Sequence, residues 1–161
     1  SYVLHKLCDS ELNEELSENE IYSYSLKIIN EKGQDEFFKI LQREKLIFVK
    51  DRLLNPILTL VSEQFLISTE CILKKDQRIK NVKKYYMGIC AVILHDIHCI
   101  SPKDIASIFD YHVVQIYNQM TSIRELNTKD IRDREIHEKY ILIKKEIYTL
   151  KNNTDARSIP A

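Results

Sequence analysis

Positive side chains are concentrated in one short stretch of this chain, residues 74–84. Asp76 is the only acid in this basic loop. Its six cations are Lys74, Lys75, Arg78, Lys80, Lys83 and Lys84. Lys and Arg at this density are typical of a site that binds a polyanion, because each can neutralise a phosphate. A loop that only keeps the surface soluble would have the same composition, so the neighbouring elements must decide between the two interpretations.

A long helix and then a short one are predicted after the basic loop. Residues 80–95 fit the long helix, and Ser101 followed by Pro102 is typical of an N-cap and a first helical residue. The short helix is predicted to end near Phe109. The Ser101 hydroxyl and the free N–H groups at this helix start can bind a phosphate oxygen, and Lys103 lies in the same turn. The candidates for contacts with a DNA backbone are therefore Lys74, Lys75, Arg78, Lys80, Lys83, Lys84, Ser101 and Lys103.

A second helix is predicted directly after a tight turn, which completes a helix-turn-helix. Asp110 and Tyr111 form the turn, since Asp tolerates the unusual dihedrals that a tight turn requires. The helix begins at Tyr111 or His112 and ends near Leu126. Its buried side is predicted to contain Val113, Ile116, Met120 and Ile123, and its outward face Val114, Gln115, Asn118, Gln119 and Ser122.

The start of this second helix carries the residues that could read DNA sequence. In a helix-turn-helix, the first residues of the second helix lie against base edges in the major groove. Gln and Asn can form two hydrogen bonds with adenine, and Val methyls can contact the methyl of thymine. The base-edge candidates are His112, Val114, Gln115 and Asn118. Two alternatives stay open: His112 fits a polar turn cap equally well, and two antiparallel helices in any bundle can mimic the motif.

Residues 1–55 are predicted to form a separate helical region. A capping box at residues 17–20 predicts a helix that stops at Gly33, which tolerates the left-handed conformation. Residues 34–54 are again helix-like, and a strand at residues 46–49 is the less favoured alternative, because a lone strand cannot satisfy its backbone hydrogen bonds.

Asn55 and Pro56 are predicted to separate this region from a DNA-binding domain of residues 56–151. A last helix is predicted over residues 129–150, and core packing or a dimer seam explains its apolar spacing equally well. The residues that recur at this spacing are Ile136, Tyr140, Ile143, Ile147 and Leu150. Residues 152–161 are predicted to be a flexible polar tail.

The zero net charge of the chain conceals two halves of opposite charge. Residues 1–71 contain 8 Lys or Arg and 13 Asp or Glu, whereas residues 72–151 contain 15 and 10. Such asymmetry indicates an anionic partner for the basic half. The acidic front region, residues 1–55, is then expected to form a homodimer or to bind a helical protein partner.

Residues from about 56 to 126 resemble the C-terminal DNA-binding domain of the bacterial replication initiator DnaA. The positions in step with that family are Val61, Phe65, Arg78, Lys80, Val82, Lys84, Ser101, Ile105, Ala106, Phe109, Ile116, Ile123 and Leu126. The resemblance implies a Trp-repressor-like helical fold that binds double-stranded DNA. It also implies that Arg78 and Lys80 contact phosphate or enter the adjacent minor groove.

The chain departs from that family in two respects. The family reads DNA with Asp-His-Thr-Thr preceded by Gly-Gly-Arg, whereas this chain has residues 112–115, His-Val-Val-Gln, after a shorter turn. It also lacks a Gly-x-x-x-x-Gly-Lys-Ser/Thr loop, so the ATPase of the initiator is absent. The resemblance therefore implies DNA binding without nucleotide hydrolysis.

Composition excludes several other classes of protein. Only 2 Gly and 3 Pro among 161 residues favour long helices over a fold rich in tight turns. The four cysteines have no Cys-x-x-Cys spacing, and no apolar stretch is long enough to span a membrane, which favours reduced thiols and a cytoplasmic protein. His95 and Cys99, even with Cys90, fall short of the four ligands of a structural zinc site.

The sequence therefore predicts an all-α helical bundle with a helix-turn-helix in its C-terminal two-thirds. Its predicted function is double-stranded DNA binding in transcription or replication control, without catalytic activity, cofactor or metal. The alternative is a helical protein-interaction scaffold whose helix-turn-helix is degenerate.

Overall fold

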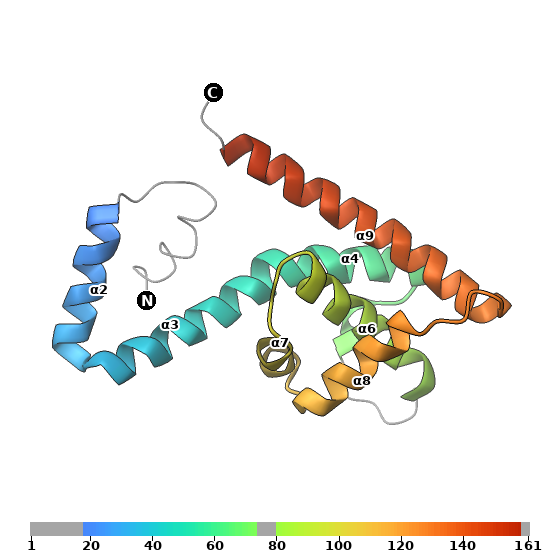
Figure 1. Cartoon of the computed structure of the whole chain (residues 1–161), viewed down its shortest axis with the longest axis horizontal. Coiled ribbons are helices and arrows are strands. Elements are labelled where there is room, and N and C mark those ends of the chain that lie inside the picture. Colours follow the sequence, from blue (N-terminus) through green and yellow to red (C-terminus); the bar gives the residue numbers. More distant parts are fainter. Residues whose placement is uncertain (1–17, 74–79, 159–161) are drawn as a thin grey trace. The chain divides into compact units, whose positions relative to one another are not determined.

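The computed structural model describes residues 18–73 and 80–158 (Figure 1). Every element in these two ranges is helical, which confirms the predicted all-α class. Residues 46–49, for which a strand was the alternative, are helical. Ser17, the first residue of the predicted capping box, lies outside the described residues.

The chain divides into two compact units. The first comprises Ser1–Asp51 and Lys151–Ala161, and the second comprises Arg52–Leu150. Every base-edge candidate, and every backbone candidate from Lys84 onward, belongs to the second unit.

The first unit contains two helices in contact, α2 (Glu18–Lys32) and α3 (Gln34–Phe48). Gly33 joins them with φ 86°, and its N–H donates to the carbonyl of Ile29 at 2.8 Å. The predicted helix stop at this glycine is confirmed, but the expected left-handed helical conformation was wrong, because Gly33 combines its positive φ with an extended ψ of 160°. In α3 the side chains of Phe37 and Ile40 are buried, whereas Tyr22, Phe38 and Ile47 are among the exposed apolar residues of the unit.

A short π-helix, Val49–Leu54, connects α3 to α4 (Asn55–Phe65). A new α-helix begins at Asn55 with Pro56 in its first turn, as predicted, and Leu54 before it has helical dihedrals, φ −75° and ψ −42°. Pro56 has no N–H to donate to the carbonyl four residues earlier, and a wider turn directly before it accommodates that missing bond. The proline therefore changes the type of helix and does not end it.

The second unit is built around one central helix. Its elements are α4, α5 (Thr69–Leu73), α6 (Lys80–Asp96), α7 (Pro102–Phe109), α8 (Val113–Arg124) and most of α9 (Ile131–Ser158). Residues 87–94 of α6 are all buried. A helix that is apolar on every side is surrounded by other elements, and α6 contacts α4, α5, α7 and α8.

The crossing of α6 and α8 depends on Gly88. A Cβ at this position would lie 2.5 Å from the backbone oxygen of Gln119 and 2.7 Å from Cγ1 of Ile123. No side chain larger than hydrogen fits there without separating the two helices. The isolated glycine inside a helical pattern thus has a packing reason, and it fixes how closely α8 lies against the core.

The last helix, α9, follows an Asp130 cap. The Asp130 carboxylate accepts the backbone N–H groups of Arg132 at 2.9 Å and Asp133 at 3.1 Å. The buried side of α9 contains Tyr140, Ile143 and Ile147, which match the predicted spacing. Two expectations were wrong: Leu150 is 48% exposed, and the helix continues to Ser158 where a frayed tail was predicted from residue 152.

Candidate nucleic-acid interface

The helices α7 and α8 lie next to each other and are joined by a tight turn (Figure 1). Asp110 adopts the left-handed conformation at φ 55° and ψ 46°, and the N–H of Tyr111 donates to the carbonyl of Ala106 at 2.9 Å. The turn falls where Asp110 and Tyr111 predicted it. Ala106 is buried, as close packing between two short helices requires.

The start of α7 is capped by Ser101. Its hydroxyl accepts the N–H of Asp104 at 3.2 Å, which confirms the predicted N-cap. Ser101 and Lys103 are both exposed. Since a hydroxyl that accepts one bond can still donate another, Ser101 keeps a donor for an external oxygen.

The start of α8 is capped by a reciprocal pair of hydrogen bonds. His112 accepts the N–H of Val114 at Nδ1, at 3.4 Å, and Gln115 accepts the N–H of His112 at Oε1, at 3.2 Å. The capping role that was an alternative for His112 is therefore present. The bonds leave Nε2 of His112 and the carboxamide NH₂ of Gln115 without a role in the cap, so each keeps a polar edge for another partner.

The outward face of α8 is defined here as His112, Val114, Gln115, Tyr117, Asn118 and Thr121, all of which are exposed. All four base-edge candidates belong to it. Val114 and Tyr117 are each 54% exposed. Tyr117 was not among the candidates, although its spacing of three from Val114 places both on one helix face. The face carries no formal charge when His112 is neutral.

Gln119 was predicted to face outward, and that prediction was wrong. Gln119 is only partly exposed, and its side-chain oxygen is buried without a hydrogen-bond partner among the described residues. The cause is the close approach at Gly88, which brings this turn of α8 against α6. Of the four residues expected on the buried side, Ile116, Met120 and Ile123 are buried, whereas Val113 is only partly buried.

Most of the basic loop is outside the described residues. Lys74, Lys75 and Arg78 belong to that part, and of Lys80 and Lys83 only the backbone, in the first turn of α6, is described. Lys84 is half-buried, with Nζ 5.0 Å from the centre of the Tyr85 ring. The backbone candidates with described side chains are thus Lys84, Ser101 and Lys103.

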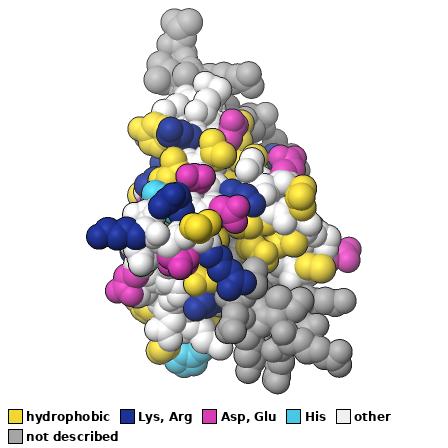
Figure 2. Space-filling view, turned by 90° about the vertical axis from the view of Figure 1, so that its right-hand side faces the viewer, with side chains coloured by type: hydrophobic (Ala, Val, Ile, Leu, Met, Phe, Trp, Pro, Cys, Tyr) yellow, Lys and Arg dark blue, Asp and Glu magenta, His cyan; other side chains and the backbone are white. Residues whose placement is uncertain are grey.

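Charges near the end of α8 are mutually paired. Arg124 donates to Asp96 at 2.9 Å, and His95 Nδ1 lies 2.8 Å from the same carboxylate oxygen. Burial of Asp96 alone would raise its pKa, but the hydrogen bonds and positive charge from His95 and Arg124 outweigh burial and lower the pKa. The pair connects the ends of α6 and α8. On the face of the molecule in Figure 2, Lys and Arg side chains alternate with Asp and Glu.

Cys90 and Cys99, which were considered for a metal site, differ in exposure. Cys90 is completely buried in α6, and burial raises the pKa of its thiol to about 12, so it stays protonated at neutral pH. Cys99 is exposed in the turn after α6 with φ 57°. Within residues 18–73 and 80–158, no three His, Cys, Asp or Glu side chains are grouped as metal ligands.

Among the described helices, none has the length and apolar content that crossing a membrane would require. Comparison of the chain with protein-family models, with curated proteins and with solved structures finds no match.

Proposed function

We propose that the second unit binds double-stranded DNA as a helix-turn-helix protein, in the control of transcription or replication. The observation that carries the proposal is the outward face of α8. It is exposed at the start of the second of two short helices, and its cap leaves polar edges available. The start of the second helix is the part of a helix-turn-helix that meets base edges.

The chemistry of this face fits base recognition. The amide of Asn118 can form two hydrogen bonds with adenine, and the NH₂ of Gln115 can donate to a purine N7 or to a thymine O4. Val114 and the ring of Tyr117 offer apolar surface to thymine methyl groups. The face therefore favours A·T pairs over G·C pairs, because it lacks the Arg that most often reads guanine.

Phosphate contacts come from other residues. Lys103 and the hydroxyl of Ser101 are exposed at the start of α7. The cations of residues 74–84 lie before α6 and in its first turns, and they add the charge that the outward face of α8 lacks. In this arrangement, phosphate contacts supply sequence-independent affinity and α8 supplies discrimination.

Fluorescence anisotropy of the full chain with labelled duplexes tests the proposal. We expect binding at low salt that weakens steeply as salt rises, because phosphate contacts release counterions. A random-duplex selection should then enrich A·T pairs. Absence of binding to every duplex at low salt would refute the proposal.

A second candidate function, a protein-interaction scaffold, is favoured by one observation. Val114 and Tyr117 form an exposed apolar pair on α8, and exposed apolar surface often marks a protein contact. Under this alternative, replacing Arg78, Lys80 and Lys84 with Ala would leave duplex affinity unchanged. A large loss of affinity in the same triple variant would favour DNA binding.

A further inference from the structure

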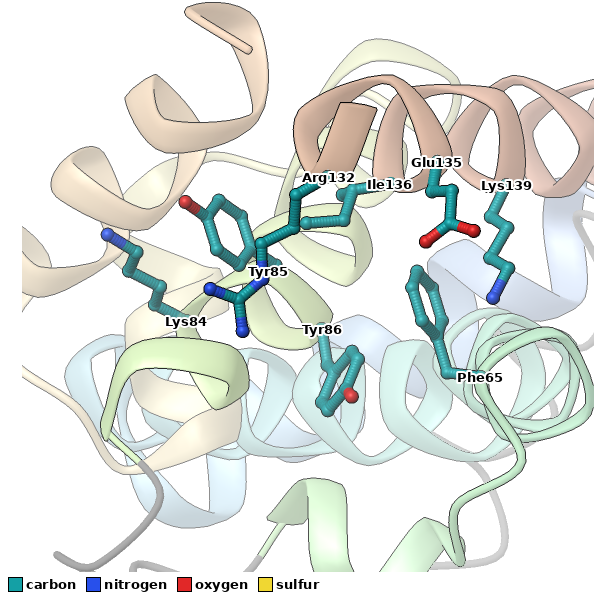
Figure 3. A pocket seen from close by; sticks show the side chains of 8 residues that line it. All are labelled: Phe65, Lys84, Tyr85, Tyr86, Arg132, Glu135, Ile136 and Lys139. Carbon is teal, nitrogen blue, oxygen red and sulfur yellow. The ribbon is translucent and has the colours of Figure 1, made fainter. Parts of the chain in front are cut away.

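A pocket of about 470 Å³ lies within the second unit, on residues that the proposed DNA interface mostly does not use. Its walls come from the last residue of α4, the first turns of α6 and the first turns of α9 (Figure 3). This volume falls in the range of about 300–1,000 Å³ that is usual for small-molecule sites. The pocket is therefore large enough for a ligand of nucleotide size.

Positive charge converges on this pocket from two helices. Lys84 belongs to α6, and Arg132 and Lys139 belong to α9, while Glu135 is the one acid among the described residues of the lining. None of the three cations forms an ion pair with another residue in the described part of the chain. Cations that converge without an acidic partner are arranged to receive an anion, and Arg132 can bind a phosphate through two parallel hydrogen bonds.

Aromatic rings form the other part of the lining. The ring centres of Phe65 and Tyr86 are 4.8 Å apart at an angle of 58°, and Tyr85 adds a third ring. Burial raises the pKa of Tyr86, so its hydroxyl stays protonated and able to donate. Rings of this kind bind a flat heterocycle by stacking, which a site for phosphate alone would not need.

Two of the cations are held above these rings. Nζ of Lys139 lies 4.9 Å from the centre of the Phe65 ring, and Nζ of Lys84 lies 5.0 Å from that of Tyr85. Figure 3 shows the side chains of Arg132, Glu135 and Lys139 projecting from α9 towards the rings of α4 and α6. The charged and aromatic groups thus share one concave space in which a phosphate and a base could be bound together.

We propose that this pocket binds a free mononucleotide. The phosphate pairs with Arg132 and with the amines of Lys84 and Lys139. These amines move off the ring faces of Tyr85 and Phe65 when they pair with the phosphate, and the base then stacks against the aromatic wall. Glu135 lowers the affinity for phosphate and favours a ligand with a donor group, such as a ribose hydroxyl. The site does not rest on DNA binding, because no residue of the outward face of α8 lines it.

Isothermal titration of the full chain with the four ribonucleoside 5′-monophosphates tests this site. We expect at least one of them to bind at least tenfold more tightly than inorganic phosphate and than its own nucleoside. Arg132→Gln combined with Lys139→Met should weaken that binding at least tenfold, and Glu135→Gln should strengthen it a few-fold. Lys145→Met is the matched control, since Lys145 is exposed on the same helix but does not line the pocket, and it should change nothing.

Three results would overturn the proposal. The first is that no monophosphate binds more tightly than inorganic phosphate. The second is that the double variant, with its helical content intact by circular dichroism, binds as the wild type does. The third is that duplex DNA fully displaces the bound nucleotide, which would assign the pocket to a DNA strand. Loss of duplex binding with nucleotide binding retained would refute only the DNA proposal.

Discussion

The outward face of α8 and the pocket between α4, α6 and α9 belong to the same compact unit but differ in chemistry. The face is exposed and uncharged when His112 is neutral, with amide, imidazole and apolar groups. The pocket is concave and contains three cations beside three aromatic rings. An uncharged face can discriminate between base pairs but attracts a polyanion weakly, whereas a cationic pocket holds an anion without reading sequence.

This difference suggests that recognition and charge are separated in the second unit. Lys84 is a described residue that the proposed DNA interface and the pocket share, because it ends the basic loop and also lines the pocket. The two regions meet through α6, whose start borders the pocket and whose middle packs on α8 at Gly88. Substitutions in α6 should therefore affect both the outward face of α8 and the pocket, whereas substitutions outside α6 should affect only one of them.

The largest effect is expected for Gly88→Val, which should damage both regions together. The added side chain would meet the backbone of α8 at a distance that no rotamer can relieve. We expect the free energy of unfolding to fall by about 3 kcal/mol or more, the upper end for overpacking of a core. Urea denaturation followed by circular dichroism measures it.

Gly33→Asn is the matched control for that experiment. Gly33 also has no side chain, but nothing lies within 4 Å of a Cβ there, so Asn at this position meets no neighbour and only strains the backbone, whose φ 86° and ψ 160° lie in a region almost exclusive to glycine. We expect a cost of about 1–3 kcal/mol from this strain alone, below the cost of Gly88→Val. Equal costs for the two variants would show that the α6–α8 crossing is not as tight as described.

A smaller and more selective effect is expected for Asn118→Ala. Loss of one base-edge pair should reduce affinity for the selected duplex by about 1–3 kcal/mol, or roughly 5- to 150-fold in Kd. Because Asn118 is exposed and distant in sequence from the pocket lining, nucleotide binding and stability should stay unchanged. Anisotropy with selected and scrambled duplexes measures the change, and an equal loss for both duplexes would contradict a base-reading role.

Local signals made the helix boundaries around these regions predictable from sequence. Three such signals act within one turn of helix, and each lies at the helix end that it was expected to form. They are Ser101 before Pro102, Asp110 at the turn, and Gly33. The buried side of α8 was also predictable, since the spacing of Ile116, Met120 and Ile123 depends only on the helical period.

Features that depend on contacts between distant segments were not predictable. The pocket joins Phe65, residues 84–86 and residues 132–139, and periodicity cannot indicate that three such segments meet. Gln119 was misplaced for the same reason, because its orientation follows from the backbone approach at Gly88 on another helix. Pro56 lies in the first turn of a new helix, as predicted, but the π-helix directly before it was not foreseen.

Lys84→Ala should have a moderate effect on both duplex binding and nucleotide binding. Removal of one phosphate contact should reduce the slope of log Kobs against log salt by about 1 for every duplex, without altering preference among duplexes. The same variant should weaken nucleotide binding, because Lys84 lines the pocket. Salt titrations with two duplexes and one nucleotide titration test both parts. An unchanged salt slope would show that Lys84 is not part of the DNA interface. The nucleotide titration would still test its place in the pocket.

The smallest effect is expected for Asp96→Asn, which removes the ion pair that connects α8 to the end of α6. Side chains of Asp96 and Arg124 are 31% and 47% exposed, so the pair should contribute at most about 1 kcal/mol.

The pKa of Asp96 is lowered in the folded protein. The contribution of the pair is therefore present above the pKa of an unfolded Asp, about 3.9, and disappears as pH falls through the lower folded value. The stability difference between wild type and Asp96→Asn should therefore be present at about pH 5 and be lost only as pH falls through the folded pKa of Asp96, below about 3.9. Urea titrations at each pH measure it, and a difference that grew as pH fell below about 4 would mean that the carboxylate is not the stabilising form. Since Asp96 ends α6 and the pocket borders the start of that helix, nucleotide affinity should not change, which separates this contact from the pocket.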